Sequence, residues 1–182
     1  MEGKQISFDR IDVRFLHINV RTEKHGDEEI TAFDCDFRYE TSNDALAIFS
    51  PTLRSDLYCV DPSIERKKGG KLAGFEEALT LLKHPAIESI RWKLGDIAGG
   101  EFVIHREVSG KDMAFELANV GKFKIEPKNG GTVAILFQAQ IRPKGKDRGE
   151  LVNLLEIGTV NVSVIPPKPI ELTSGPALDG TH

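Results

Sequence analysis

Cysteine is scarce in this sequence of 182 residues, and long apolar runs are missing from it. Its two cysteines, Cys35 and Cys59, are too few for a disulfide framework, which indicates a reducing, cytoplasmic environment. No apolar run approaches the roughly 18 residues of a membrane-spanning helix, and the first residues lack the pattern of a signal peptide. We therefore expect a cytoplasmic protein with no membrane association.

An excess of charge of one sign is also lacking. Lys and Arg number 24 and Asp and Glu 28, which leaves a net charge of −4. This balance excludes a strongly basic protein that coats nucleic acid through its overall charge, although a local basic patch is still compatible with it. Hydrophobic residues make up 40%, which is enough for one ordinary globular domain without disulfide or metal support.

The short motifs of several enzyme classes are absent. The sequence contains no phosphate loop, no dinucleotide-binding glycine motif, no C-x-x-C, no H-E-x-x-H and no G-x-S-x-G. His25, Asp27, Asp34 and Asp36 would form a metal or acid–base site only if the fold brought further groups to them. We therefore expect no catalytic residue, no metal and no cofactor, and keep a metal-dependent enzyme with a fold-assembled site as an alternative.

Two-residue alternation of apolar and polar side chains is the clearest pattern. It predicts a strand over residues 13–21 and a second over 30–40, which places Cys35 and Phe37 on a buried face and Asp34 and Asp36 on a solvated one. The charged loop between the strands indicates an antiparallel hairpin.

The other segments are short, and in many of them apolar and polar side chains also alternate. The fold class predicted is mainly β (α+β), an antiparallel β-sandwich or barrel with a few short helices. Asn-Gly-Gly at 129–131 is typical of a tight hairpin turn, and residues 61–71 are expected to form a loop. The remaining expected strands are 90–94, 101–108, 113–117, 122–126, 132–142 and 159–164, and the expected helices are 45–49, 52–58, 75–83 and 151–155.

The predicted organisation is a single domain over residues 1–165 followed by a Pro-rich tail, 166–182, that is extended or disordered. Residues 13–49 and 122–155 share one order of elements, namely strand, turn, long strand and short helix. This order predicts two pseudo-repeated halves, although hairpins followed by short helices also recur in unrelated α+β domains. An exposed edge on a long strand would favour a homodimer that covers it.

Two stretches concentrate positive charge and are candidates for a nucleic-acid site. Single-strand binding also needs exposed aromatic rings on which bases stack, and Phe15, His17, Trp92, Phe102 and His105 are the candidates for that role. The residues expected to bind nucleic acid are Arg66, Lys67, Lys68, Lys71, Arg142, Lys144, Lys146 and Arg148.

Five stretches carry a resemblance to a group of uncharacterised bacteriophage and prophage proteins. They are Asn19–Glu28, Ala32–Asp34, Ser42–Leu46, Phe49–Tyr58 and Gly130–Val133. The resemblance implies a phage origin and an infected bacterial host, and it implies no activity and no site residues. Together with the basic stretches it predicts a non-enzymatic phage-type protein that binds single-stranded DNA in replication or recombination. The alternative is an inhibitor or adaptor that binds a host protein such as a nuclease or defence factor.

Overall fold

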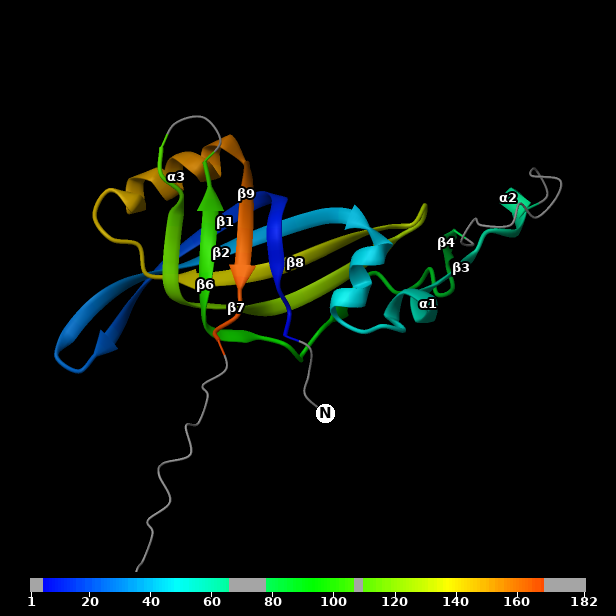
Figure 1. The fold of residues 1–182 in the computed structure, drawn as a ribbon, viewed down its shortest axis with the longest axis horizontal. Helices are drawn as coiled ribbons and strands as arrows, with labels where there is room; N and C mark the ends of the chain where they lie inside the picture. Colours follow the sequence, from blue (N-terminus) through cyan, green and yellow to red (C-terminus); the bar gives the residue numbers. More distant parts are fainter. Residues whose placement is uncertain (1–4, 66–77, 107–109, 169–182) are drawn as a thin grey trace, which may run out of the picture.

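Six antiparallel strands close into a β-barrel in the computed structural model, which describes residues 5–65, 78–106 and 110–168 (Figure 1). Around the barrel the order is β1-β2-β8-β7-β6-β9 and back to β1, with β5 added beside β7. The expected mainly-β class with few short helices is confirmed. None of the helices in the described ranges has the length and apolar character needed to cross a membrane. The elements are β1 (Phe8–His25), β2 (Glu28–Ser42), the 3-10 helix η1 (Asn43–Ile48), α1 (Leu53–Leu57), β3 (Tyr58–Val60), α2 (Pro62–Glu65), β4 (Leu79–Leu82), β5 (Ile90–Arg91), β6 (Ile97–His105), β7 (Met113–Lys128), β8 (Thr132–Ile141), α3 (Asp147–Ile157) and β9 (Thr159–Ile165).

The barrel interior is filled by the apolar side chains of the alternating strands. Phe37 of β2 is fully buried, and its ring centroid lies 4.7 Å from that of Phe15, 5.2 Å from Phe102 and 5.5 Å from Phe137. Cys35 shares this face, and its burial, aided by two neighbouring carboxylates, raises the pKa of its thiol to about 12. The predicted burial of Cys35 and Phe37 is therefore correct, whereas Asp34, which was expected on a solvated face, is only 8% exposed and accepts a hydrogen bond from Arg21.

The two longest barrel strands, β1 and β7, bend at bulges. Arg10, Leu117 and Lys122 have positive φ angles of 46°, 54° and 55°, although none of them is glycine. The bulges interrupt the alternation while the chain continues in the same strand. Two separate strands were expected at 113–117 and 122–126, but β7 runs unbroken through both.

The strand pairing has an internal two-fold pattern. Exchanging β1 with β7, β2 with β8 and β6 with β9 leaves the cyclic order of the barrel unchanged. At the two places where exchanged strands pair, Phe37 faces Phe137 and Phe102 faces Val164. In each half a helix follows the second strand, η1 after β2 and α3 after β8. The halves expected at 13–49 and 122–155 lie in these corresponding units, and their origin by duplication stays a prediction.

The elements α1, β3 and β4 dock at one end of the barrel (Figure 1). The Tyr58 hydroxyl donates to the Thr132 carbonyl at 2.7 Å and accepts from the Lys128 amide at 3.0 Å. The helix expected over 75–83 is wrong for residues 79–82, which form β4, because their backbone pairs with β3 and with the β7–β8 turn. In the expected loop at 61–71, residues 62–65 form α2, and the rest from residue 66 lies outside the described residues.

The two long strands that were expected to leave an exposed edge are paired with neighbouring strands on both sides. β2 pairs with β1 on one side and with β8 on the other, and β8 pairs with β2 and β7. The strands at 30–40 and 132–142 therefore do not leave the edge that motivated a homodimer, and the homodimer itself stays a prediction.

Candidate functional site

The first basic stretch, Arg66, Lys67, Lys68 and Lys71, lies outside the described residues. The second stretch forms the loop from β8 to α3. Lys144 and Lys146 are exposed there. The Arg148 Nε atom donates to the Pro143 carbonyl at 3.1 Å.

Arg142, the remaining member of that stretch, is engaged with acidic residues at the base of the β1–β2 hairpin. Its Nε atom donates to Glu23 Oε2 at 2.7 Å, and Glu23 also pairs with Arg21. Arg21 in turn donates from Nε to Asp34 Oδ1 at 2.8 Å. The hydrogen bond from Arg142, with that from Arg21, outweighs burial and lowers the pKa of Glu23. The charge of Arg142 is thus compensated inside the protein.

The acid–base or metal cluster kept as an alternative is not formed by the described side chains among its candidates. Asp34 is held by Arg21, and Asp36 Oδ1 accepts from Gln138 Nε2 at 2.8 Å. The side chain of His25 lies outside the described residues. Within the described part of the chain, no group of three or more His, Cys, Asp and Glu side chains is placed to hold a metal ion.

The aromatic platforms expected for base stacking are mostly in the core. Phe15 and Phe102 are buried in the barrel, and the half-buried Trp92 ring packs edge-on against Phe49 with centroids 5.6 Å apart. His17 is exposed on β1. Within the described ranges these candidates therefore do not form the row of exposed rings that binding to single-stranded DNA uses.

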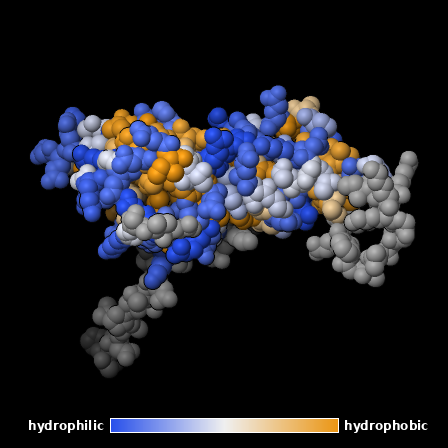
Figure 2. All heavy atoms as spheres, turned by 90° about the horizontal axis from the view of Figure 1, so that it is seen from above, coloured by the Kyte–Doolittle hydropathy of each residue, from blue (hydrophilic) through white to orange (hydrophobic). Residues whose placement is uncertain are grey.

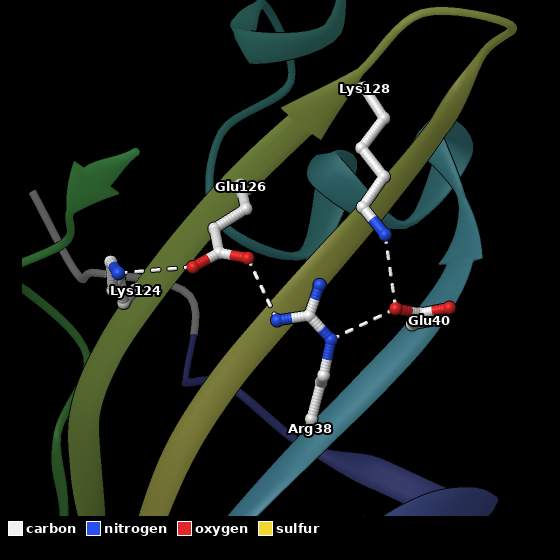
Figure 3. Close-up of polar contacts among 5 residues, drawn as sticks. All are labelled: Arg38, Glu40, Lys124, Glu126 and Lys128. Carbon is white, nitrogen blue, oxygen red and sulfur yellow. Dashed lines mark hydrogen bonds and ion pairs between the residues drawn. The ribbon is translucent and has the colours of Figure 1, made fainter. Parts of the chain in front are cut away.

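The outer surface of β2 and β7 carries a charge network in which cations and acids alternate (Figure 3). Arg38 donates to Glu40 at 2.9 Å and to Glu126 at 2.8 Å, while Lys128 binds Glu40 and Lys124 binds Glu126, both at 3.0 Å. Hydrogen bonds from Arg38 and Lys128 lower the pKa of Glu40 to about 2. Because each acid is shared by two cations, this face presents no continuous basic groove.

A cleft lies elsewhere, between α3 and the outer face of β1, β6 and β9, and has a volume of about 670 Å³. This is within the range of typical ligand sites, roughly 300–1,000 Å³. Its lining is Asp12, His105, Arg106, Glu150, Asn153, Leu154, Ile157, Thr159, Val160 and Asn161.

Strand register builds the floor of this cleft. Asp12 on β1 pairs with Asn161 on β9, which pairs in turn with His105 on β6. All three point outward because their neighbours Val13, Val162 and Ile104 point into the barrel, as side chains alternate along a strand. Asn161 Nδ2 donates to Asp12 Oδ1 at 2.8 Å.

His105 is held between two partners. Its Nδ1 atom lies 2.8 Å from Asp112 Oδ2, and its Nε2 atom lies 2.8 Å from Ser163 Oγ. A hydrogen bond from the Arg106 amide, and then one from His105, lowers the pKa of Asp112. The order carboxylate, imidazole, hydroxyl is that of serine hydrolases. Ser163, however, is only 3% exposed, and its Oγ already accepts from the Arg10 amide at 2.9 Å. The network therefore ties the β1 bulge to β6 and β9, and it does not present a nucleophile.

The wall of the cleft formed by α3 is partly apolar. Leu154 is half-buried there, while Ile157 is 70% exposed and Val152, further along α3, is 46% exposed. Figure 2, which looks down on the α3 side, shows apolar atoms gathered among polar ones at this end of the barrel. Arg106 and Glu150 form an ion pair at the rim.

Most of these residues were not predicted from the sequence; His105 was considered only as a stacking platform. They come from three strands and a helix, so no short spacing unites them. One signal of an exposed apolar side chain was present in the sequence of α3. Ile157 stands directly before Gly158, the glycine that ends the helix with a φ of 84°. Comparison of the chain with protein-family models, curated proteins and solved structures found no match.

Proposed function

We propose that the chain is a non-enzymatic binding protein of phage type whose ligand is a partner protein, and that the partner docks on α3 and the cleft beneath it. The observation that carries the proposal is the exposure of Val152 and Ile157 on a helix that borders a cleft of about 670 Å³. Exposed apolar side chains of this kind form the centre of protein interfaces, where they become fully desolvated.

Charge around the helix indicates the chemistry of the partner. Asp12, Asp147 and Glu156 are exposed or half-exposed here, while the cation of Arg106 is matched by Glu150 and one exposed cation, Arg148, lies in the first turn of α3. A surface with apolar and basic side chains complements this face. A host protein that binds DNA, such as a nuclease or defence factor, has a surface of that kind, which favours the inhibitor or adaptor role.

The test is the capture of partner proteins from a bacterial lysate by the chain, and it compares three substitutions to aspartate. Ile157→Asp and Val152→Asp place a charge in the proposed interface, while Leu117→Asp is the matched control, because Leu117 is 67% exposed on β7 and outside the cleft. We expect one protein to be retained by the wild type and by the control and to be lost from both α3 variants. Retention of the same proteins by all four chains would contradict the proposal.

Binding of single-stranded DNA is the second candidate, supported by the exposed Lys144 and Lys146 on either side of Gly145. Fluorescence anisotropy with a labelled oligonucleotide at two salt concentrations tests it. Salt-sensitive binding should weaken in a Lys144→Ala, Lys146→Ala double variant and persist in a Lys93→Ala, Lys111→Ala control, whose lysines are equally exposed. An absence of binding at low salt removes this candidate.

A further inference from the structure

We infer that the floor of the α3 cleft is a binding site for a basic side chain, Lys or Arg, presented by the partner. The inference rests on the proposed function and adds the chemical group that the cleft recognises. It is carried by the juxtaposition of Asp12, Asn161 and the apolar wall of α3.

Asp12 supplies an oriented carboxylate. Its Oδ1 atom accepts the Asn161 side-chain amide at 2.8 Å, and no other hydrogen bond or ion pair involves the Asp12 side chain among the residues the structure describes. A carboxylate has acceptor positions for about four hydrogen bonds. Asp12 is exposed, so most of these positions are open toward the cleft.

Asn161 supplies a second acceptor in the same row. Its Oδ1 atom is shielded from solvent and has no hydrogen-bond donor within the described part of the chain. A buried acceptor without a donor costs roughly 1–3 kcal/mol. A small rotation of this amide would turn the oxygen to a donor placed beside Asp12, and both acceptors would then serve one multi-donor group.

The charge balance of the cleft favours a cation. Arg106 is the one Lys or Arg among the described residues that line it, and Glu150 already neutralises it. His105 is engaged by Asp112 and Ser163 on its two ring nitrogens. The carboxylate of Asp12 thus has no counter-charge in the cleft.

Along β1, Arg14 is the nearest basic side chain that could compete with the ligand for the Asp12 carboxylate. It lies two residues from Asp12 on the same face of β1 and is exposed, and its side chain makes no hydrogen bond or ion pair with the residues described. Removing it would take a positive charge away from the approach to Asp12. We therefore expect Arg14→Ala to increase the affinity for a cation.

The apolar wall suits the stem of a basic side chain. Leu154 and Ile157 line the cleft beside the polar floor. Lys and Arg carry methylene stems that pack on apolar surface while the charged end makes hydrogen bonds. Lys offers three donors and Arg five, and a neutral polar side chain offers fewer donors and no charge.

The probes are N-acetyl-arginine amide and N-acetyl-lysine amide, titrated into the ¹⁵N-labelled full chain and followed by NMR. Their uncharged counterparts, N-acetyl-citrulline amide and N-acetyl-norleucine amide, are the ligand controls. Asp12→Asn removes the charge with little change of shape, and Asp27→Asn makes the same change at an exposed aspartate in the β1–β2 turn.

We expect saturable shifts at Asn161 and neighbouring cleft residues with the two cationic probes alone. Asp12→Asn should lower the affinity about tenfold or more, the usual effect of losing a charge-assisted hydrogen bond, and Asp27→Asn should leave it unchanged. Equal shifts with the uncharged probes, or no cleft shifts at all, would overturn the inference.

The outcomes separate this inference from the proposed function. If Ile157→Asp abolishes partner capture while the cationic probes leave the cleft unshifted, the protein interface stands and the basic-side-chain site falls. If the probes bind as expected and Ile157→Asp leaves partner capture unchanged, the site stands and the proposed function falls.

Discussion

Replacing Phe37 by alanine perturbs the centre of the barrel. The Phe37 side chain is fully buried and contacts three other phenylalanine rings, which come from β1, β6 and β8. Buried Phe→Ala substitutions cost about 3–5 kcal/mol of unfolding free energy. We expect about 4 kcal/mol here, because strands hydrogen-bonded on both sides cannot readily close the cavity.

Urea denaturation followed by circular dichroism measures this cost. Phe137→Ala should lose a similar amount, because its ring lies opposite that of Phe37 across the β2–β8 pairing. Leu117→Ala, on an exposed side chain, should change stability by less than about 0.5 kcal/mol. If Phe37→Ala does not fold, Phe37→Leu should still fold and lose about 1–2 kcal/mol. A loss below about 1 kcal/mol for either alanine variant would refute the assigned core face.

Three further predictions concern the Tyr58 hydroxyl, the two cysteine thiols and the loss of stability at acidic pH. Tyr58→Phe should cost about 1–3 kcal/mol in urea denaturation, because two backbone groups of the β7–β8 hairpin lose their partner; an unchanged midpoint would refute this docking contact. In the native protein a thiol reagent should modify the half-buried Cys59 and spare Cys35, whose pKa is about 12, whereas two rapidly reacting thiols would contradict that burial. The folded-state pKa values of Glu23 and Glu126 are lowered from 4.5, so their contribution is present above about pH 4.5 and is lost as pH falls through the folded values. The variant Glu126→Gln should flatten this acid-side fall in a pH series of unfolding free energies, and an unaltered slope would refute the contribution.

Much of the fold follows from local alternation. In β2 the alternating residues Phe33, Cys35 and Phe37 are all buried in the core, so the pattern alone identifies this buried face. The pattern misleads at Leu117 and Lys122, where bulges shift the alternation inside one strand. It also misleads at residues 79–82, whose leucines suit a helix, because their strand pairing partners are distant in sequence.

The closure of the barrel and the position of the cleft could not be predicted from the local pattern of apolar and polar residues. Both depend on which strands become neighbours, and β6, β9 and β1 meet although their residues are far apart in the chain. Charge pattern likewise identified Arg142 as a candidate ligand for phosphate, but its partner Glu23 comes from the opposite end of the sequence. Composition reveals the positive charge of a loop, whereas its neutralisation appears only in the folded chain.

Site-specific photocrosslinking tests the central claim most directly. A photoreactive amino acid is placed at Val152 on α3, or at Leu117, which is more exposed and lies outside the proposed interface. Irradiation of the captured complex should join the partner to the chain labelled at Val152 and leave the chain labelled at Leu117 free. Equal crosslinking from both positions, or crosslinking from Leu117 alone, would contradict a partner-binding surface on α3.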